Sequence, residues 1–316
     1  MSINSDSNAT VLAKICVLCP AIPFPLRNTT KAHIAVLLTN FFFATNLSLV
    51  KHISPSMIGP YGVNLLRVGI TLLLFWMLWA FSKQAAGIDK KDVPRFAACA
   101  LTGVVINQML FIKGLTLTST IHAALLMLTT PLLISALALW WLREKFTAHK
   151  LLGLLLGIGG ALLLILSRDA SGVASVKGDL LILINAISYA IYFIIVKPLT
   201  SRYSPLHVIR WVFTFGFLMI VPFSWQEANQ AAWQSATLMQ WGALASVVIC
   251  GTFLTYSFNS FSLKHLGAAT TGSYIYTQPI FAAIIAAIFL QEGFSLEKAL
   301  AGALIFGGVY LGSRRA

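Results

Sequence analysis

Charge is scarce in this sequence. Only 10% of the 316 residues are charged, whereas an ordinary soluble domain carries about 25%. Hydrophobic residues make up 58% of the chain, and the mean hydropathy is +0.83. The polar breaks between apolar runs are all too short to form a soluble domain. This composition excludes an ordinary soluble protein and predicts a chain that lies in a lipid bilayer.

Acidic residues are the scarcest charged class. The nine acids all fall in tails, loops or predicted helix ends: Asp6, Asp89, Asp92, Glu144, Asp169, Asp179, Glu227, Glu292 and Glu297. A proton relay through buried carboxylates is therefore not expected, and His122 is the one titratable candidate away from the predicted span ends. Asp89 and Asp92, beside Lys90 and Lys91, are typical of a solvated charged loop. We expect a pathway suited to a neutral, zwitterionic or anionic solute.

Cysteine is also rare, and the net charge of +13 is dispersed. Four cysteines are too few for a disulfide framework, and the Cys16–Cys19 pair lacks a second pair or nearby histidines that would complete a zinc site. We expect no metal and no cofactor. The cations lie in short breaks rather than on one soluble face, which argues against a nucleic-acid partner.

An internal repeat organises the chain. Residues 128–160 align without a gap with residues 276–308, at an offset of 148 positions, and eleven of the 33 pairs are identical. The identical pairs include Thr129 with Thr277, and Pro131 with Pro279. A repeat of this kind indicates two copies of one structural unit.

Ten apolar segments have roughly the length needed to cross a bilayer. We predict them at residues 32–50, 62–82, 93–112, 119–142, 151–167, 179–197, 207–225, 238–258, 270–290 and 298–312. Residues 1–31 form a loose tail, residues 32–167 the first unit, and residues 179–312 the second. Five crossings per unit is an odd number, so the second unit enters the membrane from the opposite side. The predicted fold is an all-α integral membrane protein of ten transmembrane helices in two inverted five-helix repeats, a plan common among secondary transporters.

The positions of Lys and Arg predict the orientation. If both termini are cytoplasmic, inside segments hold fifteen of these cations and outside segments hold five. Cytoplasmic loops carry the excess of Lys and Arg. We therefore expect both termini in the cytoplasm.

Polar side chains recur at helical spacing inside several spans, as expected for the lining of a cavity. The candidate substrate-binding residues are Asn46, Gln108, His122, Tyr189, Tyr192, Tyr256, Asn259, Tyr274, Thr277 and Gln278. The alternative is that such groups, together with Asn185, Ser188, Thr252 and Thr255, only hydrogen-bond between helices. Large polar groups inside packed helices need a partner, which keeps the tyrosines, asparagines and glutamines as candidates.

Two arginines, two prolines and two glutamates also stand out. Arg67 fits either an anchor near the outer boundary or an intramembrane function, and Arg210 fits a side chain that reaches the cytoplasmic interface. Pro131 and Pro279 occupy matching helices of the two units, where each can kink its helix and serve a gating motion. Glu144 and Glu292 precede helices that begin at Thr147 or Ser295, which are good N-cap residues.

A family resemblance follows from several of these residues. The first unit contains Ala123-Ala124-Leu125-Leu126, Pro131, Arg143-Glu144, Gly153 and Gly159-Gly160, and the second contains Pro279, Glu292 and Gly307-Gly308. Over residues 32–312 the chain resembles the EamA family of the drug/metabolite transporter superfamily. The resemblance implies a ten-helix carrier of the bacterial inner membrane that exports amino acids or other metabolites. It also implies a central cavity between helices 1, 3, 4, 6, 8 and 9, with peripheral helices 5 and 10 able to pair two subunits in a homodimer.

The favoured function is therefore a secondary transporter that moves a small polar metabolite, an amino acid or related compound, by alternating access. An integral membrane enzyme would need a paired acid and base, a nucleophile or metal ligands at a membrane face. A channel-like facilitator would need charged rings or a carbonyl filter. These two alternatives stay open, although the sequence contains neither signature.

Overall fold

The computed structural model describes residues 28–54, 56–81, 87–141, 148–166, 174–290 and 295–313. Within these ranges all regular secondary structure is helical. The first half contains α2 (Asn28–Ile53), α3 (Pro60–Ala80), α4 (Val93–Ala100), η1 (Leu101–Ile106), α5 (Asn107–Leu117), α6 (Thr120–Met127), α7 (Thr130–Trp141) and α8 (Ala148–Leu166). The second half contains α9 (Val176–Thr200), α10 (Pro205–Asn229), α11 (Leu238–Val248), η2 (Ile249–Leu254), α12 (Thr255–Ser273), η3 (Tyr274–Thr277), α13 (Gln278–Ile285), η4 (Ala286–Leu290) and α14 (Leu296–Ser313).

Six helical stretches are long and apolar enough to cross a membrane. They are Asn28–Ile53, Pro60–Ala80, Val93–Leu117, Val176–Thr200, Leu206–Asn229 and Leu238–Asn259. Three shorter apolar stretches accompany them: Thr120–Ile134, Leu151–Leu166 and Tyr274–Leu290. The protein is thus a multi-pass, all-helical membrane protein, and the number of ten crossings stays a prediction. The first helix begins at Asn28, four residues before the predicted span.

Helix ends follow the local sequence. Pro60 lies in the first turn of α3, where its missing N–H costs nothing. The carboxylate of Glu227, from the end of α10, accepts hydrogen bonds from the amides of Tyr61 (2.6 Å) and Gly62 (3.1 Å). Ser295 caps α14 by accepting from the Lys298 amide (3.3 Å), as the sequence predicts. Glu144 and Glu292, the tail to residue 27 and the cysteines within it lie outside the described residues.

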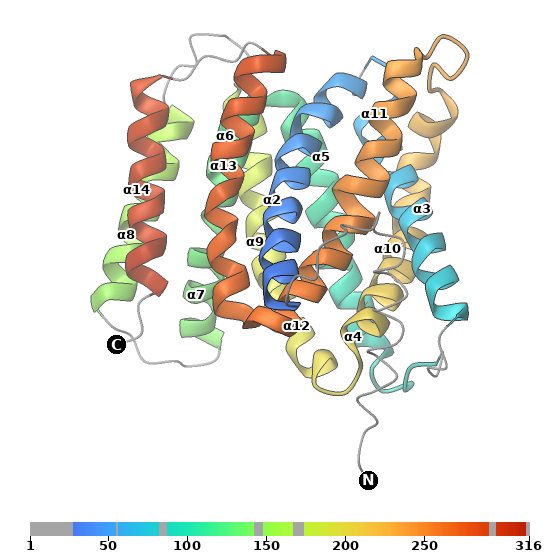
Figure 1. The fold of residues 1–316 in the computed structure, drawn as a ribbon, viewed down its shortest axis with the longest axis horizontal. Helices are drawn as coiled ribbons and strands as arrows, with labels where there is room; N and C mark the ends of the chain where they lie inside the picture. Colours follow the sequence, from blue (N-terminus) through green and yellow to red (C-terminus); the bar gives the residue numbers. More distant parts are fainter. Residues whose placement is uncertain are drawn as a thin grey trace.

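The helices lie side by side in one bundle (Figure 1). α2 is central, next to α12 and α13, whereas α8 and α14 pack along each other at one edge. A Cβ on Gly308 would lie 2.5 Å from the Gly153 carbonyl oxygen, so these two backbones touch because glycine permits it. Large apolar side chains face outward, among them Leu73 (69% exposed) and Phe289 (74%). This distribution suits contact with lipid and leaves the polar groups to the interior.

Two π-helical stretches interrupt the bundle at matching places. η1 and η2 are separated by the same 148 positions as the sequence repeats. Each contains a glycine against which a side chain from the opposite half packs. A Cβ on Gly103 would lie 2.5 Å from Tyr192 of α9, and a Cβ on Gly251 would lie 2.5 Å from the Asn46 amide of α2. π-Helical turns are rare and often occur at functional sites, so this pair directs attention to the residues around it.

Candidate functional site

Three predicted tyrosines meet in the interior. Tyr189 and Tyr192 of α9 have ring centroids 5.7 Å apart, and Tyr256 of α12 is close enough to interact electrostatically with both. Tyr256 also packs edge-on against Phe213, with centroids 5.6 Å apart. α9 and α12 thus bring together side chains that are 64 or more positions apart in the sequence.

Tyr189 is accessible near the middle of its helix. It is 13 residues from the start of the 25-residue α9, on the order of 20 Å along its axis. Of the Tyr189 surface 38% is accessible, and Tyr189 lies on roughly the opposite side of α9 from the exposed residues Leu180, Ile184 and Ile187. The accessible surface of Tyr189 is therefore separate from that apolar face, and its hydroxyl and ring are grouped with those of Tyr192 and Tyr256.

A second group of polar residues is buried without partners. Asn46 (1% exposed) and Gln108 (2%), both predicted site residues, have side-chain amide atoms that form no hydrogen bond among the described residues. The same is true of Asn64, of Thr71 and of two guanidinium nitrogens of Arg67, all on α3. A buried polar group left without a hydrogen bond costs about 1–3 kcal/mol, and a charged group costs more. Sequence reasoning missed Asn64 and Thr71, although their spacing of three and four from Arg67 places all three on one helix face.

A third group forms hydrogen bonds that tie α2 to the helices of the second half. The Gln278 amide donates to Asn40 Oδ1 at 2.8 Å, and the Tyr274 hydroxyl lies 2.8 Å from His33 Nδ1. Thr277 donates to the Tyr274 carbonyl at 2.7 Å. Of the predicted residues, Tyr274 and Gln278 thus bond to α2, and Thr277 bonds to the backbone of Tyr274 beside them. The remaining candidate of this half, Asn259, is half-buried on α12.

His122 lies at a helix end rather than at mid-depth. It occupies the first turn of α6, where its amide donates to the N-cap oxygen of Ser119 at 3.1 Å. Its Nδ1 is 3.0 Å from Asp179 Oδ2, and Thr118 donates to the other carboxylate oxygen. His122 and Asp179 are both about 1% exposed. The sequence places Asp179 at a helix end. It does not show that the start of α9 is buried against the start of α6, because only the packing of these two helices brings Asp179 and His122 together.

Other members of the polar stripes bond to backbone. The Asn185 amide donates to the Asn107 carbonyl at 2.6 Å, and Ser188 donates to the Thr102 carbonyl at 2.7 Å. Thr252 and Thr255 each donate to the carbonyl five positions earlier, at 3.1 and 2.8 Å. Thr102 and Thr252 lie in π-helical turns, where the wide turn disrupts the usual carbonyl bonding. Asn185 and Ser188 thus bond between helices, whereas Thr252 and Thr255 bond within their own helical segment.

Both candidate gating prolines stand where a helix is interrupted. α6 ends at Met127 and α7 begins at Thr130, one residue before Pro131. η3 ends at Thr277 and α13 begins at Gln278, so Pro279 is again the second residue. Each proline starts a new helix, where its fixed φ is favourable. The two halves are thus interrupted at equivalent places, as the equivalent positions of Pro131 and Pro279 in the repeats predict.

Two charged residues are more buried than the sequence predicts. Arg210 is 3% exposed, and its guanidinium carbon lies 4.7 and 4.9 Å from the ring centroids of Trp76 and Trp79. Stacking on indole and a contact with His207 Nδ1 at 3.1 Å satisfy the charge inside the bundle. Asp92, expected in a solvated loop, is only 5% exposed.

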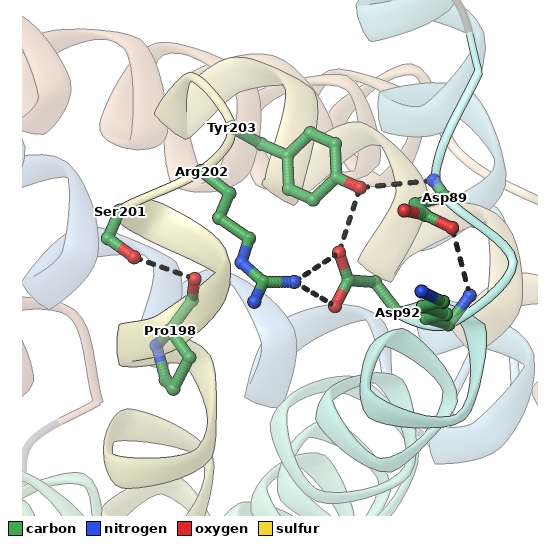
Figure 2. Close-up of polar contacts among 7 residues, drawn as sticks. Asp89, Asp92, Pro198, Ser201, Arg202 and Tyr203 are labelled. Carbon is green, nitrogen blue, oxygen red and sulfur yellow. Dashed lines mark hydrogen bonds and ion pairs between the residues drawn. The ribbon is translucent and has the colours of Figure 1, made fainter.

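Asp92 belongs to a polar cluster that joins the two halves (Figure 2). Its carboxylate accepts from Arg202 Nη1 at 3.1 and 3.3 Å and from the Tyr203 hydroxyl at 2.9 Å. The Asp89 amide donates to the Tyr203 oxygen at 3.0 Å. That donation lowers the pKa of the Tyr203 phenol, but burial and the carboxylate of Asp92 raise it further, so the pKa lies above its ordinary value. The cluster fastens the turn before α4 to the turn after α9.

The chain is similar to a known family of membrane proteins and to several individual proteins. The profile of the EamA-like transporter family matches residues 30–166 and again residues 176–314. The uncharacterized transporter YetK of Bacillus subtilis is 27% identical over 254 residues, which cover 79% of this chain and 76% of YetK. An uncharacterized transporter of Archaeoglobus fulgidus is 23% identical over 289 residues, covering 89% of this chain and 97% of the relative.

A solved crystal structure shares the fold. It superimposes with a TM-score of 0.59 at 16% identity, covering 90% of this chain and 96% of the other. The family and the names of the relatives point to a transporter rather than an enzyme. Because the family profile covers nearly the whole chain in two successive matches, this multi-pass membrane protein belongs to the EamA-like transporter family.

Proposed function

We propose that this transporter is a secondary carrier that moves a small polar metabolite, an amino acid or related compound, out of the cell across the bacterial inner membrane. In this proposal ten helices form two inverted five-helix repeats, residues 32–167 and 179–312, with both termini in the cytoplasm. The observation that carries the proposal is the group formed by Tyr189, Tyr192 and Tyr256, in which Tyr189 is accessible near the middle of α9 on the side away from most of the exposed apolar residues of that helix.

Alternating access is supported by contacts that can open and close. Ser262 of α12 donates to the Ala32 carbonyl of α2 at 3.0 Å, next to the His33–Tyr274 contact, and the Asn40–Gln278 bond lies eight residues beyond Ala32 along α2. These few hydrogen bonds join the first half of α2 to α12, η3 and α13. Each is worth about 0.6–2 kcal/mol, so the set can break during a transport cycle. The matched π-helical turns give the two halves equivalent points at which to bend.

The test is transport by purified protein in liposomes. Uptake from a pool of labelled amino acids and common metabolites should exceed the protein-free control for at least one solute. Tyr256→Phe, Tyr189→Phe and Asn259→Ala should lower that uptake, with Tyr310→Phe on exposed α14 as the matched control. Folded protein that moves no solute of the pool would count against the carrier. Uptake that rises linearly with concentration without saturation would favour a channel-like facilitator.

A further inference from the structure

Arg67 is a buried cation whose charge the described protein leaves uncompensated. It lies seven residues into α3, about 10 Å along the helix from Pro60. Only 6% of the residue is exposed, and its Nε and Nη1 atoms have no hydrogen-bond partner among the described residues. The outward face of α3 is marked by Leu73 and Met77, 69% and 56% exposed, so Arg67 points away from lipid.

The groups nearby are polar but neutral. Asn64 and Thr71 share the Arg67 face of α3, and Tyr256 of α12 is close enough to interact with the guanidinium electrostatically. α5, which carries the unpartnered Gln108 amide, packs against α3. Hydroxyl and amide groups of this kind can orient a ligand, but none of them supplies a negative charge.

No carboxylate of the described ranges serves as the counter-ion. Asp89 and Asp92 belong to the cluster in Figure 2, and Asp179 binds His122. Glu227 caps α3 through backbone amides, and Glu297 lies exposed on the first turn of α14. A charge inside a membrane protein is costly unless it is paired or serves a function. The missing charge is therefore expected to come from a ligand.

We propose that Arg67 binds the carboxylate of the transported solute. This inference rests on the proposed carrier function and narrows its substrate class to solutes that bear a carboxylate. The planar guanidinium can donate two parallel hydrogen bonds to the two oxygens of a carboxylate. One guanidinium balances the single negative charge of a carboxylate but not the greater charge of a phosphate monoester. The unpartnered amides and the Tyr256 phenol contact the rest of the solute.

The test compares matched probes and matched variants. Purified protein is heated with acetate, pyruvate or L-leucine, and separately with acetamide, pyruvamide or L-leucinamide, at constant ionic strength. At least one carboxylate should raise the melting temperature of wild type more than its amide does. Arg67→Gln should weaken that binding about 10- to 100-fold, as expected for the loss of a hydrogen bond to a charged group. Arg95→Gln, which changes an exposed arginine of α4, should leave it unchanged.

Arg67→Lys guards against misfolding of the glutamine variant. It retains the charge but not the planar fork, so it should keep the preference for carboxylate over amide with affinity reduced about tenfold. Wild type that binds amides as tightly as carboxylates would overturn the inference. So would Arg67→Gln if it bound a carboxylate within twofold of wild type.

Uptake of the same probes into liposomes separates the two proposals. Uptake of a neutral solute that is equal in wild type and Arg67→Gln would keep the carrier and refute the role of Arg67. Carboxylate binding that depends on Arg67, without uptake of any probe, would support the anion site and refute the carrier.

Discussion

The polar interior contains two kinds of region. Around α3 and α5, Asn64, Arg67 and Gln108 are buried with side-chain atoms that have no hydrogen-bond partner among the described residues. Between α2 and α13, the Gln278 amide donates to Asn40 Oδ1 at 2.8 Å. Paired groups hold helices together, whereas unpaired groups lower stability and need a functional reason. The contrast separates residues that maintain the bundle from residues available to a solute.

The buried pair of His122 and Asp179 should give the largest effect on stability. Asp179→Asn leaves His122 Nδ1 and the Thr118 hydroxyl with a poorer partner, and breaking a buried charged contact costs about 3–5 kcal/mol. We expect a fall of several degrees in the melting temperature in detergent. Glu297→Gln, at an exposed carboxylate, is the control and should change it little. Equal melting temperatures for the two variants would show that this pair does not hold α6 against α9.

A substitution at Gly251 of η2 tests how closely the region around the unpartnered Asn46 amide is packed. Gly251→Ala would place a methyl carbon 2.5 Å from the Asn46 amide oxygen, and such overpacking costs about 1–3 kcal/mol. We expect initial uptake to fall about tenfold. Gly242→Ala in α11 places its new carbon more than 4 Å from the described residues outside its own stretch of helix, so this variant should transport normally. A Gly251→Ala protein with wild-type uptake would remove the case for a functional π-helical turn.

Replacing Gln108 and replacing Gln278 should change the free energy of unfolding in opposite directions. Gln108→Met replaces an unpartnered buried amide with an apolar group of similar size, so in the absence of solute the free energy of unfolding should rise by about 1 kcal/mol. Gln278→Met removes the bond to Asn40 and should lower it by about 1 kcal/mol. Denaturation of both purified variants measures the difference. Changes of the same sign would contradict the division into unpaired and paired regions.

Breaking the ion pair between Arg202 and Asp92 should have the smallest effect on stability. Arg202 contacts Asp92 at 3.1 Å, but its side chain is 62% exposed. Exposed pairs contribute about 0–1 kcal/mol and are screened by salt. Arg202→Gln should therefore lower stability only slightly, and less at high ionic strength. A loss as large as that of Asp179→Asn would mean that pairing matters regardless of burial.

Much of the architecture could be predicted from composition and the repeat. Apolar runs predict membrane helices because a helix needs about 20 apolar residues to cross the hydrocarbon core. The described helices coincide with the predicted segments within a few residues at most ends. The matched prolines predict matched interruptions. The π-helical turns were not predictable, because their extra residue per turn leaves no mark in a pattern read at 3.6 residues per turn.

The sequence by itself determined that the chain is an apolar, helical, two-part membrane protein, since hydropathy and an internal repeat are properties of the chain. It also selected Asn46, Gln108 and the three tyrosines as unusual, because large polar groups are costly among apolar ones. Only the tertiary structure decided which polar groups are paired. The partners of His122, Tyr274 and Gln278 lie 57, 241 and 238 positions away, and packing alone brings them together or leaves Arg67 without a counter-ion in the described part of the chain.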